Sequence, residues 1–340
     1  MKKKLKSALN IIVSLIVIVL CVYYAMKDID IDKLWSIILN ANYLWVILPF
    51  PVIILSHWIR AVRWKRILKP IKKTESTFDL FSSVMVGYAL NGITPRGGEF
   101  VRPYTFSRRE KVSYSSVFAT IVVERFIDLL TLVLLLSGTF IFLSDKIIQG
   151  LPSQFDTNKL VFVGVLVLGV MILGFYPPAV RFLLRILLKP LSQKYYDKIM
   201  ELFEKFLVGF AIIKSPSEYF MLIVESLFIW LLYTLPMYFM FFSFNFQYSA
   251  NLGFEDAILM IVVSGVVTTI APTPGALGLY HVAIQNALVS IYGIPPEEAL
   301  AYATLTHGIN YLIQMGLGGL FFFRENISGM KEELAVEPAE

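Results

Sequence analysis

The feature that most constrains this chain is a series of apolar segments about as long as a membrane is thick. About 20 apolar residues in a helix cross the ~30 Å hydrocarbon core of a bilayer. With 57% hydrophobic and 16% charged residues, against ~25% charged in soluble proteins, the chain is predicted to be an all-α, polytopic integral membrane helical bundle. The apolar segments run at about 9–26, 43–62, 77–93, 115–143, 159–176, 218–243, 257–271, 279–293 and 300–323.

The first apolar segment follows a basic start, "MKKKLKSALN", and resembles a signal peptide. It is longer than a typical signal segment and has no small-residue cleavage site, so we expect a retained span with a cytoplasmic basic end. The lone Cys21 excludes a disulfide framework. The net charge of +5 is typical of basic loops beside membrane spans and requires no nucleic-acid partner.

The stretch "NGITPRGGEFVR", residues 91–102, decides the topology. If 77–93 crossed the membrane, the strongly basic stretch 94–113 would lie outside, against the positive-inside rule. If 77–93 dips into the membrane and returns, the charges of the later connectors agree with the positive-inside rule. Treating 257–293 in the same way predicts about six full spans plus two re-entrant, broken helical hairpins. Eight spans result if 257–271 and 279–293 both cross.

Both versions place the protein in the cytoplasmic membrane with cytoplasmic N- and C-termini. We expect one membrane domain, 1–323, followed by a short cytoplasmic tail, 324–340. Within the domain, 177–216 is predicted to be a cytoplasmic amphipathic helical insertion. It either touches anionic lipid heads or, as we favour, is a connector that obeys the positive-inside rule.

The two predicted breaks, "ITPRGGE" and "APTPGALG", share a Thr-Pro pair followed closely by glycine. Broken chain inside a membrane is tolerated only where it is buried in protein or lines a cavity. Broken helices that enter from opposite faces are typical of inverted-repeat transporters, and the sequence suggests such a repeat. The residues expected at the breaks or their cavity are Thr94, Pro95, Pro272, Pro274, Gly275 and Gly278.

Three charges lie deep in the segment 115–143. Glu124 and Asp128 are four residues apart and share a helix face, and Arg125 is three residues before Asp128. Such charges cost roughly 2.5–3.5 kcal/mol each on insertion scales, so they should pair or face a wet cavity. They form either an isolated structural pair or, as we favour, a binding site.

A second set of charges lies in the opening stretch. Arg96, Gly97, Gly98, Glu99 and Arg102 surround the point where the helix restarts after Pro95. Free N–H groups at a helix start attract phosphate or carboxylate, arginine binds phosphate oxygens bidentately, and glycine permits close approach. Asn91 could cap the broken chain. The alternative is a solvated cytoplasmic turn.

The histidines His57, His281 and His307 lie in or beside apolar segments without metal-ligand spacing, so no metal and no cofactor are expected. His307, Asn310 and Gln314 form a polar stripe on the last span, and His281 pairs in spacing with Gln285. Such residues act as contacts between membrane helices or line a cavity, and the sequence leaves both open.

Three pieces of the sequence, "NGITPRGGEFVRPYTFSRRE", "ERFIDLLTL" and "PTPGALGLYHVAI", together resemble the flippase-like membrane domain of the lysylphosphatidylglycerol synthase family. The resemblance covers about 10–323. It implies a bundle with broken helices that moves a phospholipid or isoprenoid-linked lipid between leaflets. The family's polar positions map onto Asn91, Pro95, Gly98, Glu99, Arg102, Glu124, Arg125, Asp128, Pro274, Gly275 and Gly278.

Two positions depart from the family pattern. His281 stands where the family commonly has Glu, and an Arg often found in the last span is replaced near His307. We interpret the two histidines as a coupled change that keeps a polar contact. The seventeen residues after Phe323 leave no room for the aminoacyl-transfer domain of the bifunctional synthases, so a stand-alone membrane domain is expected.

The favoured function is therefore a lipid translocase rather than an enzyme, since no nucleotide-binding motif or nucleophile elbow is present. Arg96 and Arg102 would hold an anionic headgroup, and Glu99, Glu124 and Asp128 would balance them. The alternatives are a membrane transferase acting on a lipid or polyprenyl carrier, with Glu124 or Asp128 as base, and a scaffold for an envelope protein. The expected partners are a membrane phospholipid or lipid-linked substrate, with a homo-oligomer or an envelope-synthesis partner possible.

Overall fold

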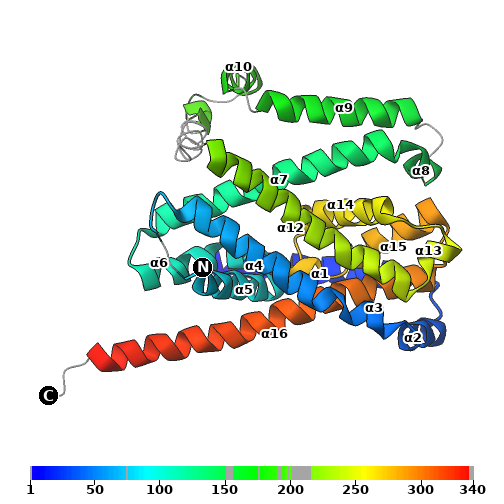
Figure 1. Cartoon of the computed structure of the whole chain (residues 1–340), viewed down its shortest axis with the longest axis horizontal. Coiled ribbons are helices and arrows are strands. Elements are labelled where there is room, and N and C mark those ends of the chain that lie inside the picture. Colours follow the sequence, from blue (N-terminus) through cyan, green and yellow to red (C-terminus); the bar gives the residue numbers. More distant parts are fainter. Residues whose placement is uncertain are drawn as a thin grey trace.

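The computed structural model describes residues 2–73, 76–150, 156–174, 177–189, 193, 195–197, 199–200 and 216–336, and these residues form helices and connecting turns without a strand. The all-α prediction is confirmed (Figure 1). The helices are α1 (Lys2–Met26), α2 (Ile31–Leu39), α3 (Tyr43–Ile47), α4 (Pro49–Leu68), α5 (Thr77–Ile93), α6 (Gly98–Glu110), α7 (Tyr114–Phe142), α8 (Ser144–Gln149), α9 (Thr157–Gly174), α10 (Pro177–Leu187), α12 (Pro216–Ser243), α13 (Phe246–Ser249), α14 (Phe254–Ile270), α15 (Leu279–Tyr292) and α16 (Pro296–Val336), with a short 3₁₀ turn η1 (Pro274–Ala276).

Several helices have the length and composition of membrane spans. Tyr43–Leu68, which joins α3 and α4, and Ser217–Ser243 in α12 are long and apolar enough to cross a bilayer. The apolar part of α1 joined to α2 is a third candidate, bent by 87° between Met26 and Ile31. These helices fit the predicted polytopic membrane protein.

The first predicted break is a tight helical hairpin made by α5 and α6. Pro95 biases Thr94 to the extended conformation (φ −130°, ψ 136°), which ends α5. The Asn91 side-chain oxygen accepts a hydrogen bond from the Gly98 N–H at 2.9 Å, so the predicted capping role of Asn91 is confirmed. A Cβ on Gly98 would lie 1.8 Å from the Gly87 carbonyl oxygen. Glycine is therefore required for the two arms to pack this closely.

The second predicted break is a hairpin made by α14, η1 and α15. Gly275 (φ +57°) and Gly278 (φ +80°) adopt positive φ values that favour glycine and turn the chain back. The Ser14 hydroxyl of α1 donates to the Pro272 carbonyl at 2.8 Å. Because α15 has 14 residues and a length of about 21 Å, it is too short to cross a ~30 Å core. This length favours a broken hairpin over two complete spans.

The two hairpins extend from opposite sides of the molecule and meet at their tips, with α5 and α6 on the left of Figure 1 and α14 and α15 on the right. Arg96 at the first tip donates to the Thr269 carbonyl of the second hairpin. From α16, the Tyr311 hydroxyl donates to the Gly92 carbonyl at 3.1 Å, and His307 Nε2 donates to the Gly275 carbonyl at 2.9 Å. We call these three contacts the seam.

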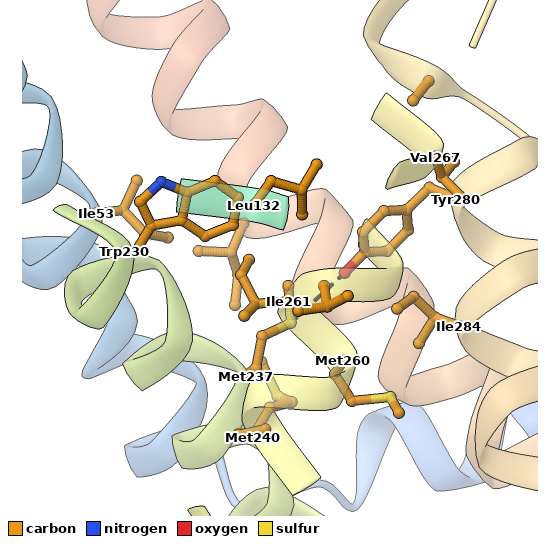
Figure 2. Close-up of a cluster of buried hydrophobic side chains, with 14 of the residues drawn as sticks. Ile53, Leu132, Trp230, Met237, Met240, Met260, Ile261, Val267, Tyr280 and Ile284 are labelled. Carbon is orange, nitrogen blue, oxygen red and sulfur yellow. Dashed lines mark hydrogen bonds between the residues drawn. The ribbon is translucent and has the colours of Figure 1, made fainter. Parts of the chain in front are cut away.

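The main apolar core packs between α12, α14 and α15, with contributions from α4 and α7 (Figure 2). Trp230, Met237 and Met240 of α12 face Met260 and Ile261 of α14 in this cluster. In lipid, such helices associate through close packing and polar contacts rather than through burial from water. The core fixes the second hairpin against α12.

The described residues cover the predicted insertion and the predicted tail only in part. Of the expected insertion 177–216, the described part is mainly the helix α10, and most of the remainder lies outside the described residues. At the other end, α16 continues without interruption past the predicted boundary at residue 323 to Val336. The first part of the expected tail is thus a continuation of the last helix.

Candidate functional site: a buried charge cluster

Charged side chains from α4, α6 and α7 meet beside the first hairpin. We call this group the charge cluster. Glu124 is completely buried, and Arg102 is 4% exposed. The members are Arg60, Arg63, Glu99, Arg102, Glu124, Arg125 and Asp128.

Arg60 of α4 joins the two acidic residues of α7. Its Nε lies 2.7 Å from Glu124 Oε1, and its guanidinium also bonds Asp128. The Tyr233 hydroxyl accepts a third hydrogen bond from Arg60 at 2.8 Å. The predicted common face of Glu124 and Asp128 is confirmed, because one guanidinium contacts both carboxylates.

Arg63 lies one turn further along α4 and is completely buried. Its guanidinium is 2.5 Å from Asp128 Oδ1 and donates to the Ser226 hydroxyl at 2.9 Å. The apolar segment 43–62 ends one residue before Arg63, so the segment boundary does not predict a buried position for this residue. Helix α4 continues to Leu68 and carries Arg60 and Arg63, three residues apart, on its buried face.

Arg102 brings the first hairpin into the cluster. Its guanidinium contacts both Glu124 oxygens at 3.0 Å, and it lies over the Trp64 ring, 3.8 Å from the ring centre. The aromatic face further stabilises the buried cation. The α6 helix is thereby held against α4 and α7 by a planar cation with two kinds of partner.

Arg125 completes the cluster toward the hairpin. It lies 3.7 Å from Glu99, 3.6 Å from Glu124 and 3.6 Å from Asp128. The Arg125–Asp128 pair is therefore part of a network and not the isolated structural pair considered as the alternative. Its partial exposure contrasts with the burial of Arg102 and Glu124.

A small pocket of about 10 Å³, room for one water molecule, lies at the junction of α5, α6 and α7. Glu99 and Arg102, three residues apart on α6, both line it. Its walls contain charged side chains, one amide side chain, apolar side chains and the backbone of two glycines. The lining residues are Val84, Gly87, Tyr88, Asn91, Gly98, Glu99, Arg102, Ile121 and Arg125.

The charge cluster contains one more cation than anion, since four guanidiniums face three carboxylates. Buried ions lose their hydration and stay charged only when they are well paired. Every member here has an oppositely charged partner within 4 Å. The formal excess of one positive charge, next to a pocket, favours an anionic ligand.

Not all predicted site residues join the cluster. Arg96 adopts a positive φ of 56° and reaches across the seam to Thr269 instead. Asn310 is exposed on α16 and accepts a hydrogen bond from Gln314 at 3.0 Å. Gly97 lies in the turn, where its N–H donates to the Thr94 carbonyl at 3.2 Å.

The two unusual histidines do lie together. The His281 and His307 rings meet edge to face, with centres 4.9 Å apart, so the predicted contact is confirmed. Gln285 acts as a contact between helices, donating to the carbonyls of Ala25 and Pro296. Among the described residues, no group of three or more His, Cys, Asp or Glu side chains could hold a metal ion.

A second ionic group lies at the start of the second hairpin, away from the pocket. Buried Asp256 contacts Lys146 Nζ of α8 at 2.8 Å and accepts from the Gly253 N–H and the Tyr292 hydroxyl, each at 2.8 Å. Burial opposes the charge on Lys146, but hydrogen bonds to Asp256 raise its pKa overall. This group caps α14 and fastens it to α8, a structural role.

Sequence reasoning missed the α4 half of the cluster, Arg60 and Arg63, and the tyrosines Tyr88 and Tyr233. A signal was present in "HWIRAVRW", where His57, Arg60 and Arg63 recur every three residues at the end of an apolar segment. Such spacing places them on one helix face. Their partners on α7 and α12 could be identified only from the fold.

The broken hairpins, the buried charges and the apolar helices together define a polytopic membrane protein with a polar site inside its bundle. The chain belongs to the family described as the lysylphosphatidylglycerol synthase TM region, which matches residues 11–318.

Curated relatives place the chain in the same group. It is 27% identical to a UPF0104 membrane protein of Methanocaldococcus jannaschii, covering 92% of this chain and 93% of the relative. It is 24% identical to a UPF0104 membrane protein of Pyrococcus horikoshii, covering 94% and 97%. It is 22% identical to the glycosyltransferase AglD of Haloferax volcanii, covering 98% of this chain but 58% of AglD.

Proposed function

We propose that the protein is a lipid translocase that moves an anionic phospholipid or isoprenoid-linked lipid between the leaflets of the cytoplasmic membrane. The observation that carries the proposal is the buried, net-positive charge cluster beside a pocket at the first hairpin. Charges are costly at membrane depth and mark substrate pathways there. Arginine suits a phosphate headgroup because its planar fork binds two oxygens.

In this proposal, the headgroup enters between α6 and α7 while its tails stay in lipid. Arg102 and Arg125 contact the phosphate, and Glu99 sets the charge balance at the mouth of the pocket. The pocket has room for one water molecule, so α5 and α6 must move away from α7 to admit a headgroup. The seam must then part before the headgroup can pass to the second hairpin.

The favoured orientation places the N-terminus, α6 and the end of α16 on the cytoplasmic side. The first hairpin then opens to the cytoplasm and the second to the outside. The positive-inside rule supports this choice, because the last turn of α4 and the residues after it, around Lys65, Arg66 and Lys69, are strongly basic. Headgroup binding would start from the cytoplasmic leaflet.

A second candidate, a membrane transferase acting on a lipid or polyprenyl carrier, draws on the similarity to AglD. The match covers 58% of AglD, so its named activity need not lie in the shared region. A general base also needs an oxygen free to take a proton. Glu124 and Asp128 each contact several guanidiniums, which disfavours that role and makes translocation the better proposal.

Reconstitution into liposomes with headgroup-labelled lipids tests the proposal, first alone and then with sugar donors. Exposure of the label at the opposite leaflet without covalent change supports translocation, and a chemically altered lipid defeats it. Glu99→Gln, Arg102→Ala and Asp128→Asn should each abolish movement. If all three variants fold and behave like the unmodified protein, the site assignment is wrong.

A further inference from the structure

The side chain of His57 is buried in the bundle without a hydrogen-bond partner. The residue is 2% exposed, and neither ring nitrogen meets a donor or acceptor in the described part of the chain. An unpaired buried polar group destabilises a protein, and an apolar side chain of similar shape avoids that penalty. Packing alone therefore does not explain why a histidine occupies this position.

The surroundings of His57 connect it to the pocket. Its ring packs against the ring of Tyr88 at 4.4 Å, and Tyr88 lines the pocket. The Tyr88 hydroxyl lies 3.5 Å from that of Tyr233, which accepts a hydrogen bond from Arg60. His57 is thus adjacent to the charge cluster through Tyr88.

The buried face of α4 carries His57, Arg60 and Arg63 at intervals of three residues. At 1.5 Å per residue these positions cover about 9 Å along the helix axis. Arg60 and Arg63 are bound to Glu124 and Asp128. His57 is the member of this row with no hydrogen-bond partner on any polar atom of its side chain.

We propose that His57 is a headgroup-binding residue, the next contact of the translocating lipid after Arg102 and Arg125. As the headgroup moves along α4 past Tyr88, the imidazole donates a hydrogen bond to a phosphate oxygen. A neutral donor suits this position, because it can hold the headgroup briefly without a permanent ion pair. The inference rests on the proposed translocase function and extends its path beyond the pocket.

The test is a pair of variants of similar size, His57→Gln and His57→Met, in the full-length protein. Glutamine keeps a hydrogen-bond donor, and methionine removes it. Each variant is reconstituted with headgroup-labelled phosphatidylglycerol, and its thermal unfolding is measured alongside the translocation rate. We expect His57→Met to be at least as thermostable as the unmodified protein and about tenfold slower. His57→Gln should keep most of the rate.

Gln247 provides a matched control. Its side-chain oxygen is also buried without a partner, but it lies on α13. Gln247→Met removes an unpartnered polar group there and should leave the rate unchanged.

Equal rates for His57→Gln and His57→Met, with Arg102→Ala inactive, overturn the role of His57 and leave the translocase proposal standing. If the unmodified protein moves no lipid, the translocase proposal fails and this inference fails with it. The test depends on the ratio of the translocation rates of the two His57 variants. A loss of stability that both variants share therefore does not obscure the result.

Discussion

The two broken hairpins have similar backbone breaks, but the first hairpin is charged at its break and the second is neutral. In each, a proline follows the residue that ends the incoming helix, Pro95 after Thr94 and Pro272 after Ala271, and glycine allows the chain to return. The first hairpin carries Arg96, Glu99 and Arg102 at or just after its break. The second has no charged residue from 257 to 296, and its polar groups there are neutral, including His281 and Thr273.

This difference indicates that the two hairpins have different roles. A charged, net-positive site retains an anion, whereas a neutral polar site stabilises a break without competing for that anion. In a translocase with this layout, the headgroup would bind tightly on one side of the seam and weakly on the other. The following predictions test that asymmetry.

The largest effect is expected from Arg102→Ala, which removes the ion pair between the first hairpin and Glu124. Breaking a buried ion pair costs about 3–5 kcal/mol, and Glu124 would lose both contacts to Arg102. We expect a large loss of thermal stability together with loss of lipid movement. Lys159→Ala, which removes an exposed pair with Asp156, serves as the control and should change stability by less than about 1 kcal/mol.

His281→Glu introduces a negative charge into the neutral hairpin and should increase the asymmetry, because a carboxylate repels an anionic headgroup. An unpaired charge at membrane depth costs roughly 2.5–3.5 kcal/mol. Since His281 and His307 are in ring contact, adding His307→Arg supplies a partner and should restore stability and transport. A double variant that is no better than His281→Glu in thermal unfolding would contradict the coupled interpretation of the two histidines.

Gly98→Ala should separate the arms of the first hairpin. The new Cβ would clash with the Gly87 carbonyl, and overpacking of this kind costs about 1–3 kcal/mol. Gly308→Ala on α16 is the matched control, since a Cβ there meets nothing within 4 Å. A Gly98→Ala variant with normal melting temperature and transport rate would show that close packing of α5 and α6 is dispensable.

The smallest effect is expected at the seam. Tyr311→Phe removes the hydrogen bond to the Gly92 carbonyl, worth about 0.5–1.5 kcal/mol. Because the seam must part during movement in the proposed mechanism, this variant should move lipid faster while unfolding at a slightly lower temperature. A slower rate would indicate that the contact stabilises an active conformation rather than holding the hairpins closed.

Much of the first hairpin could be predicted from the sequence, because its determinants are local. Pro95 and the paired glycines mark the break, and helical spacing places Glu124 and Asp128 on one face. The charge pattern of the connectors required the chain to return. Asn91 lies seven residues before Gly98, close enough for a capping role to be expected.

The α4 half of the cluster could not be predicted in the same way. Arg63 stands next to Lys65 and Arg66, and all three suit a basic connector equally well. Only the rotation of α4 against α7 and α12 buries Arg63 and leaves Arg66 at the periphery with Glu218 and Glu225. The position of Arg96 likewise depends on the second hairpin, more than 170 residues away.

The small size of the pocket bears on the permeability of the host membrane. A protein that holds seven ionised groups inside a bilayer could conduct protons or small ions through its centre. Here the carboxylates are clamped by guanidiniums, the free space amounts to about 10 Å³, and the seam closes the route between the hairpins. We expect such a conformation to be insulating, which would let cells carry many copies without dissipating their ion gradients.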